Sequence, residues 1–120
     1  MNLCEKSDHS TLNRIVQSRA WVPSLWPLEV ANSLQMAVRR HRIDTAFRDA
    51  SLANLALLNI QMDPDTANFA WNDTLRLAGR HDLTPYDATY LELALRLSLP
   101  LATRDSALRK AAVDRKVSGA

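Results

Sequence analysis

The sequence predicts an α/β fold with a short parallel sheet, and three observations lead to this prediction. Stretches with the apolar spacing of amphipathic helices alternate with short apolar runs of strand length. Only 2 Gly and 5 Pro leave little room for long loops or an all-β meander. With 47% hydrophobic residues, the 120-residue chain is expected to form one domain, with a poorly defined start at 1–7 and a tail at 114–120.

Helix signals recur along the chain. Helices are expected over 8–19, 24–40, 45–55, 66–80, from 84 to the apolar run at 97, and over 106–113. Ser24, Asp44 and Thr84 are the expected N-caps of three of these helices, because their side-chain oxygens can accept a hydrogen bond from a first-turn N–H. Asp82, which follows a helix end, is expected in the left-handed conformation that Asp tolerates.

Three short stretches between these helices predict strands: 20–23, 56–62 and 97–102. The sequence Asp63-Pro64-Asp65 predicts a turn, in which both Asp residues are expected to serve as turn and cap residues. Trp71 and Leu75 are expected to be packed core positions, with a contact surface as the alternative.

Composition and charge narrow the function classes. A net charge of +2 permits a nucleic-acid partner without requiring one. The single Cys4 excludes an internal disulfide and a cysteine metal site, which favours a reducing, cytoplasmic setting. No apolar run approaches the ~20 residues of a membrane span, and the N-terminus lacks a signal-peptide core.

Two acids of the C-terminal half are candidates for chemistry. Asp87, Leu91 and Leu95 share one helical face, so a carboxylate lies in line with an apolar stripe. Asp105 follows the run at 97–102, and ligands of open α/β sheets bind beyond the carboxyl ends of strands. Capping is the alternative for both: Thr84 and Asp87 have capping-box spacing, and Asp105 precedes a helix.

Glu29 is the third candidate, and capping does not explain it. It follows the extended piece at 20–23 and sits beside an apolar helical stripe. In a parallel sheet, Glu29, Asp87 and Asp105 would meet at one edge. Three carboxylates without His or Cys suit a hard cation, Mg²⁺ or Mn²⁺. Such an ion would orient water and offset charge on a phosphodiester.

Other features indicate less specific roles. The scattered His9, His41 and His81 lack metal-ligand spacing, and 2 Gly cannot build a glycine-rich phosphate loop. The basic cluster 39–42 is expected to be a solvated helix end, with phosphate binding as the alternative. Thr103 is expected to end a strand, with orientation of water or metal as the alternative.

Two blocks resemble the PIN-domain family, and within it the VapC-type toxins of bacterial toxin–antitoxin pairs. They are Trp-Val-Pro-Ser-Leu-Trp-Pro-Leu-Glu-Val-Ala-Asn at 21–32 and Leu-Thr-Pro-Tyr-Asp-Ala-Thr-Tyr-Leu-Glu-Leu-Ala at 83–94, followed by Leu-Pro-Leu-Ala-Thr-Arg-Asp at 99–105. The resemblance implies a three-layer α/β/α sandwich and a Mg²⁺-dependent endoribonuclease that cleaves RNA. It also implies a homodimer inhibited by a small antitoxin protein.

Carried over residue by residue, the resemblance implies that Glu29, Asp87 and Asp105 are metal-binding and catalytic residues, supported by Thr103. The chain departs from the family pattern at its start, where an opening strand that ends in a metal-binding Asp is missing. Glu5 and Asp8 are the only early acids, and neither is expected to end a strand, so the role of that Asp is not carried over to them. The chain is expected to be a fragment, a late start or a degenerate copy, and activity is expected to suffer.

Three hypotheses follow. The first is an active ribonuclease, the second an inactive truncated domain that binds an antitoxin or its own kind, and the third a helical interaction module whose acids are all caps. The third predicts no parallel strands at 99–102. For the first two, the sheet is expected to show a gap or a substitute strand, from residues 2–4 or from a partner chain.

Overall fold

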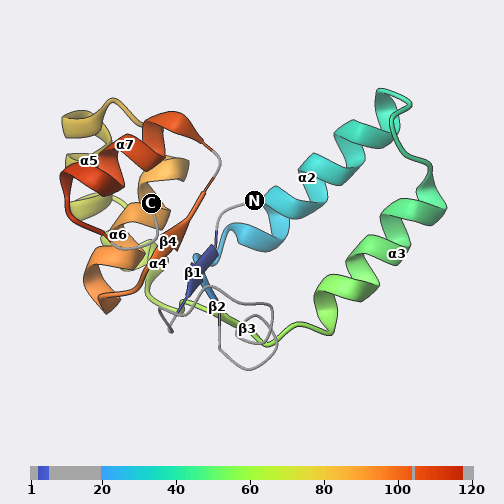
Figure 1. Ribbon diagram of the computed structural model, residues 1–120, viewed down its shortest axis with the longest axis horizontal. Coiled ribbons are helices and arrows are strands. Elements are labelled where there is room, and N and C mark those ends of the chain that lie inside the picture. The colour runs from blue at the N-terminus through green and yellow to red at the C-terminus, as the bar shows by residue number, and fades with distance from the viewer. Residues whose placement is uncertain (1–2, 6–19, 104, 118–120) are drawn as a thin grey trace.

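The computed structural model describes residues 3–5, 20–103 and 105–117. Four short strands form one sheet in the order β3-β2-β1-β4, where β1 is Leu3–Glu5, β2 Ala20–Val22, β3 Ile60–Met62 and β4 Leu101–Ala102. Helices flank the sheet on both sides, α4 to α7 on one and α2 with α3 on the other (Figure 1). The α/β class and the three-layer arrangement are therefore confirmed, and the sheet excludes a purely helical module.

Strand β1 occupies the centre of the sheet and runs against its neighbours. β1 pairs antiparallel with both β2 and β4, whereas β2 and β3 are parallel. β2, β3 and β4 consequently share one direction, and their carboxyl ends lie at one edge. The parallel pairing is confirmed for β2 and β3, while the sheet as a whole is mixed. A substitute strand was expected at 2–4; the strand found is 3–5, and residue 2 lies outside the described residues.

The register also places Glu5. Its Cα pairs with that of Ala20, the first residue of β2, whereas Leu3 pairs with Ala102 at the end of β4. Glu5 therefore lies at the sheet edge opposite the carboxyl ends of β2 and β4. The expectation that Glu5 does not end a strand is wrong, because Glu5 is the last residue of β1. The antiparallel direction of β1 nevertheless keeps Glu5 away from the edge where β2 and β4 end. Asp8 and the helix expected over 8–19 lie outside the described residues.

The core lies on the α4–α7 side of the sheet. It is built around α6 (Pro85–Leu97), which packs against α4 (Thr66–Phe69), α5 (Asp73–His81) and α7 (Ser106–Asp114). Thr84 caps α6 as expected, since its Oγ1 accepts a hydrogen bond from the Asp87 N–H at 3.1 Å. Asp82 adopts the expected left-handed conformation, with φ of 54°.

The other side of the sheet carries a helical hairpin, α2 (Trp26–Arg39) and α3 (Thr45–Ala56). Asp44 caps α3 as expected, because Oδ1 accepts the Phe47 N–H at 2.7 Å. The expected Ser24 cap is wrong. Leu25 occupies the N-cap position without a side-chain bond, and the Ser24 N–H donates instead to Thr66 Oγ1.

Three predicted boundaries are wrong. The strand expected over 56–62 is only Ile60–Met62, because α3 continues to Ala56. The strand expected over 97–102 is only Leu101–Ala102, because α6 includes Leu97 and ends at a left-handed Ser98. The helix expected over 66–80 is divided into α4 and α5, because the Asn72 side chain accepts the Asp73 N–H and starts a new helix.

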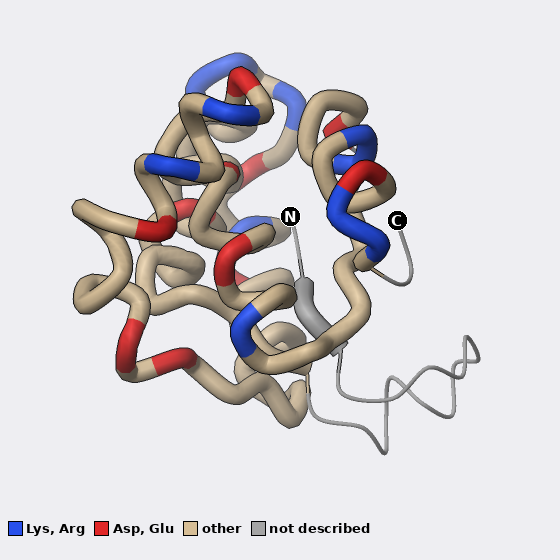
Figure 2. The backbone as a smooth tube through the Cα atoms, turned by 90° about the vertical axis from the view of Figure 1, so that its left-hand side faces the viewer, with Lys and Arg blue, Asp and Glu red and all other residues tan. Residues whose placement is uncertain are grey.

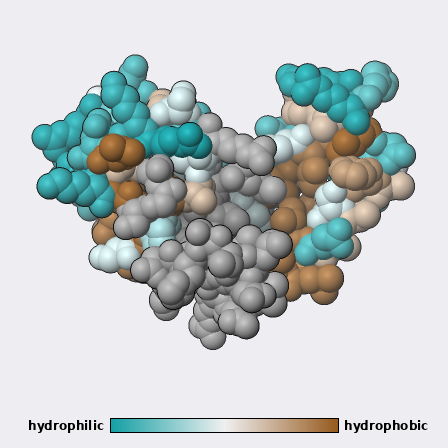
Figure 3. Space-filling view, in the orientation of Figure 1, coloured by the Kyte–Doolittle hydropathy of each residue, from teal (hydrophilic) through white to brown (hydrophobic). Residues whose placement is uncertain are grey.

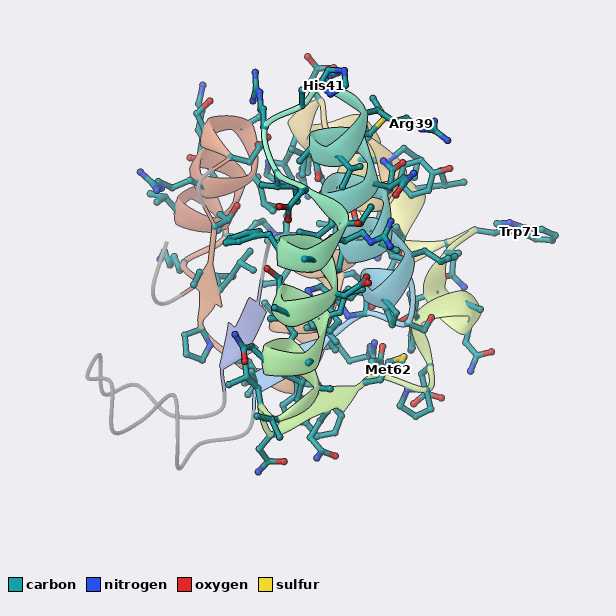
Figure 4. All side chains as sticks on the ribbon, turned by 90° about the vertical axis from the view of Figure 1, so that its right-hand side faces the viewer. Arg39, His41, Met62 and Trp71 are labelled. Atoms are coloured by element: carbon teal, nitrogen blue, oxygen red, sulfur yellow. The ribbon has the colours of Figure 1, made fainter. Side chains whose placement is uncertain are left out.

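The predicted core positions of Trp71 and Leu75 are also wrong. Trp71 is 92% exposed and projects away from the fold (Figure 4), and Leu75 is half exposed. Acidic and basic residues are interspersed along the tube on the α4–α7 side (Figure 2). Among the described residues, none of the helices has both the length and the apolarity needed to cross a membrane.

Candidate functional site

Asp105 stands between β4 and α7, at the carboxyl edge of the sheet. It is the N-cap of α7, where Oδ1 accepts the Leu108 N–H at 2.8 Å. Its own N–H donates to Oγ1 of the buried Thr103 at 3.1 Å, and the Thr103 carbonyl accepts a hydrogen bond from Arg109. The capping role foreseen for Asp105 is confirmed. The cap uses one carboxylate oxygen of Asp105, Oδ1. The Thr103 hydroxyl fixes the position of the Asp105 backbone by accepting its N–H.

Asp87 lies in the first turn of α6, where the negative charge of Asp105 acts on it. Its side chain is half-buried, and this burial is the main cause that raises its pKa. The negative charge of Asp105 raises the pKa further, while a hydrogen bond with Thr84 lowers it. The effect of the Asp105 charge indicates that the fold brings these two carboxylates, 18 residues apart in the sequence, near each other. The predicted meeting of both with Glu29 stays a prediction.

Glu29 lies in the first turn of α2 and is tied to α6. The hydroxyl of Tyr90 in α6 donates a hydrogen bond to Glu29 Oε1. Tyr90 is 1% exposed and follows Asp87 by three residues, so the two side chains lie on neighbouring positions of α6. Glu29 is therefore anchored to the helix that carries Asp87.

The donor set fits a hard cation in part. Carboxylate oxygens of Asp87 and Asp105 are the ligands that Mg²⁺ takes, and Mg²⁺ binds proteins through one or two carboxylates while keeping several waters. In the part of the chain that the structure describes, however, no three His, Cys, Asp or Glu residues form a group that could hold a metal ion. The carboxylates of Asp87 and Asp105 are of the type that coordinates such an ion directly.

The sequence analysis missed a second polar cluster next to the core, made by Asp63, Glu92 and Arg96. The Arg96 guanidinium donates to Asp63 Oδ2 at 2.5 Å and to Glu92 Oε2 at 2.7 Å. Asp63 and Glu92 are buried, and Arg96 stacks over the ring of Phe69 at 4.4 Å from its centroid. The i,i+4 spacing of Glu92 and Arg96 is a signal that predicts their pairing.

The contacts within this cluster shift the pKa of Asp63 and the pKa of Arg96. Burial alone would raise the pKa of Asp63, but hydrogen bonds from Arg96, the Asp65 N–H and Thr66 together hold it below its usual value. Hydrogen bonds to Glu92 raise the pKa of Arg96 above its ordinary value, so Arg96 stays charged. The cluster joins Asp63, which directly follows β3, to Glu92 and Arg96 of α6. The turn role foreseen for Asp63 is present, but its burial was not foreseen.

The basic cluster 39–42 is exposed at the far end of α2. Arg39 and His41 lie at this end of the hairpin (Figure 4). His81 ends α5, as the sequence predicted for a helix-end histidine. The exposed residues 39–42, His41 among them, agree with the solvated helix end foreseen for them. The solvated position foreseen for His81 is wrong, because its Nε2 atom is buried and has no hydrogen-bond partner among the described residues.

A family model for the PIN domain matches residues 3–114. The chain belongs to the PIN-domain family. PIN domains are in general nucleases, and they generally use divalent metal ions. The match confirms the resemblance of the two sequence blocks at the level of the family. No match was found among curated proteins or among solved structures.

Proposed function

We propose that this PIN domain is a Mg²⁺-dependent endoribonuclease of VapC type, the toxin of a type II toxin–antitoxin pair that acts on RNA in the cytoplasm. The observation that carries the proposal is the Asp87–Asp105 pair at the carboxyl edge of the sheet, with Glu29 anchored to the same helix as Asp87. The family membership and the blocks at 21–32 and 83–105 support it.

The proposed roles of the residues follow from their places. Asp87 and Asp105 would hold Mg²⁺ or Mn²⁺ directly, and Glu29 would accept hydrogen bonds from water bound to the ion. Thr103 would support the site by fixing the Asp105 backbone. A bound Mg²⁺ supplies a polarised water and offsets negative charge on the phosphodiester.

The test is RNA cleavage by the purified chain with Mg²⁺ and with EDTA. Asp105→Asn is the sharpest variant, because Asn caps a helix as well as Asp does, so that α7 is retained while the charge is lost. Cleavage is expected to fall by more than the ~10–100-fold typical of outer-shell changes. Asp114→Asn is the matched control, since Asp114 is exposed at the other end of α7. Cleavage that survives EDTA, or survives Asp105→Asn, would contradict the proposal.

The proposed partners are an antitoxin protein and a second copy of the chain. Large apolar side chains are exposed on or beside the α2–α3 hairpin, including Leu28 at 77%, Phe47 at 59% and Leu57 at 84%. Hydrophobic residues gather over this hairpin (Figure 3), and an apolar hollow of about 300 Å³ lies among α2, α3, β2 and β3. Exposed apolar patches of this kind mark interaction sites.

One observation favours a second candidate, an inactive domain that only binds an antitoxin or dimerises. The central strand β1 runs antiparallel to its neighbours and directs Glu5 to the opposite edge, and no described group of three acids forms. A purified chain that cleaves no RNA at any Mg²⁺ concentration, but forms a stable dimer or antitoxin complex in size-exclusion chromatography, would favour this candidate.

A further inference from the structure

We propose that the basic cluster 39–42, together with Phe47 on α3, is a binding site for single-stranded RNA that is separate from the Asp87–Asp105 pair. The cations hold the phosphates, and the ring of Phe47 stacks on an unpaired base. This inference rests on the proposed function, because RNA is the ligand in both, but it requires no metal ion. A hollow that the cluster shares with Phe47 motivates it.

The arginines of the cluster are exposed and available to a ligand. None of the three, Arg39, Arg40 and Arg42, forms an ion pair with an acid among the described residues. Arg48 on α3 differs from them, because its Nε atom lies 2.9 Å from a carboxylate oxygen of Asp49. The cluster therefore carries positive charge that is not offset by a paired acid, and such charge attracts a phosphate backbone.

Backbone hydrogen bonds fix the turn that carries the cluster. The His41 N–H donates to the Val38 carbonyl at 3.0 Å, and the Arg42 N–H donates to the Ala37 carbonyl at 2.9 Å. These two bonds form a Schellman motif, and His41 has the left-handed conformation that the motif requires, with φ of 57°. Because the backbone is already held, only side chains have to be ordered when a ligand binds.

Phe47 adds an aromatic surface beside these cations. An open hollow of about 610 Å³ is lined by His41, Arg42, Ile43, Asp44 and Phe47. Phe47 is 59% exposed. Asp44 is the one acid among these five residues, and its Oδ1 already accepts the Phe47 N–H. Cations beside an exposed ring are the combination that binds single-stranded nucleic acid, because unpaired bases stack on the ring while the cations meet the phosphates.

Positive charge alone would also attract an acidic protein segment, but two observations favour RNA. The chain belongs to a family of nucleases, so a nucleic acid is a ligand that the protein meets in any case. Hydrophilic residues gather at this end of the hairpin, whereas hydrophobic residues lie along the rest of it (Figure 3). The end of the hairpin therefore suits a charged strand, and the apolar remainder suits a protein partner.

The test is the binding of a short fluorescein-labelled oligouridylate, measured by fluorescence anisotropy in EDTA over a series of salt concentrations. Each phosphate contact to a single strand contributes ~0.7 to the slope of log affinity against log salt. Arg40→Gln combined with Arg42→Gln is therefore expected to weaken binding and to reduce this slope by ~1.4. Arg115→Gln combined with Lys116→Gln is the matched control. It removes two exposed charges at the end of α7 away from Asp105, and it is expected to leave affinity and slope unchanged.

Variants of Phe47 separate stacking from charge. Phe47→Ala is expected to weaken RNA binding by ~10-fold without changing the salt slope, because stacking releases no counterions. Phe47→Tyr keeps an aromatic ring and is expected to retain the affinity. Leu57→Ala, which removes another exposed apolar side chain of the hairpin, is the control and is expected to have no effect. Circular dichroism checks that each variant is folded, as expected for changes at exposed residues.

The outcomes separate the inference from the proposed function. A wild type that cleaves RNA with Mg²⁺, but whose RNA binding is absent in EDTA or is unchanged by the arginine pair and by Phe47→Ala, would overturn the hairpin site and leave the ribonuclease standing. A loss from the arginine pair alone, with polyglutamate bound as tightly as the RNA, would assign the cluster to an acidic protein and overturn the RNA site. A wild type that neither binds nor cleaves RNA would overturn both proposals.

Discussion

Helices α6 and α3 have similar lengths, 13 and 12 residues, and both carry many apolar side chains, yet the fold treats them differently. Seven consecutive residues of α6 are buried, because α4, α5, α7 and the sheet surround it. None of the residues of α3, all of which the structure describes, is buried, and α3 packs mainly against α2.

The difference shows that the sequence of a helix determines its apolar face, whereas the burial of that face depends on which other elements pack against it. One side of the sheet has four helices to share its apolar surface, and the other has two among the described residues. The α4–α7 side therefore carries the stability of the domain, and the α2–α3 side carries exposed apolar area. The hydrogen bond from Tyr90 of α6 to Glu29 of α2 links the two sides.

Among the variants that test the difference between the two sides of the sheet, Arg96→Ala is expected to lower the free energy of unfolding most. The change leaves Asp63 and Glu92 buried without their shared cation, which typically costs about 3–5 kcal/mol in the free energy of unfolding. Urea unfolding followed by circular dichroism measures it. Arg76→Ala is the matched control, because Arg76 pairs with Asp73 on the surface and such pairs contribute about 0–1 kcal/mol. Equal losses in the two variants would show that the buried cluster does not stabilise the α4–α7 side.

A smaller effect is expected from truncating one leucine on each side of the sheet. Leu91→Ala removes a fully buried side chain of α6 and is expected to cost about 2–5 kcal/mol in the free energy of unfolding. Leu57→Ala, just beyond the end of α3, changes a side chain that is 84% exposed and is expected to stay within about 0.5 kcal/mol. Thermal or urea unfolding of both variants checks the contrast. A loss above about 1 kcal/mol for Leu57→Ala would mean that the hairpin is covered in solution, by a second copy for example.

The smallest expected effect concerns acid pH and Asp63. Its pKa is lowered in the folded protein, so its contribution to stability is fully present above the unfolded value of 3.8 and is lost as the pH falls through the folded value. The wild type is therefore expected to lose more unfolding free energy below about pH 4 than Asp63→Asn does, because Asn does not titrate in that range. Urea unfolding across the acid range measures the difference, and identical pH slopes would contradict the assignment to Asp63.

Much of this molecule follows from local sequence. Asp44 and Thr84 cap their helices because a short polar side chain before a helical stretch satisfies a first-turn N–H wherever the helix packs. The carboxylates at 87 and 105 were predicted to meet for a similar reason: strands that share a direction deliver their carboxyl ends to one edge. Their electrostatic coupling agrees with that prediction.

Other features depended on long-range contacts. An apolar run such as 97–102 is compatible with helix or strand, and only the packing of α6 decided that Leu97 belongs to the helix. The pairing of Asp63 with Arg96 joins residues 33 positions apart, and that of Glu29 with Tyr90 joins residues 61 apart. Neither pair leaves a periodic signal in the sequence.

The sequence by itself determined the α/β class and the caps at Asp44, Thr84 and Asp105, because these depend on side-chain chemistry and on spacing within one element. Tertiary structure decided that β1 enters the sheet antiparallel, that α6 is buried while α3 is exposed, and that Tyr90 reaches Glu29. The physical reason is that burial and pairing are properties of two surfaces brought together, and the pattern of one segment describes only one of them.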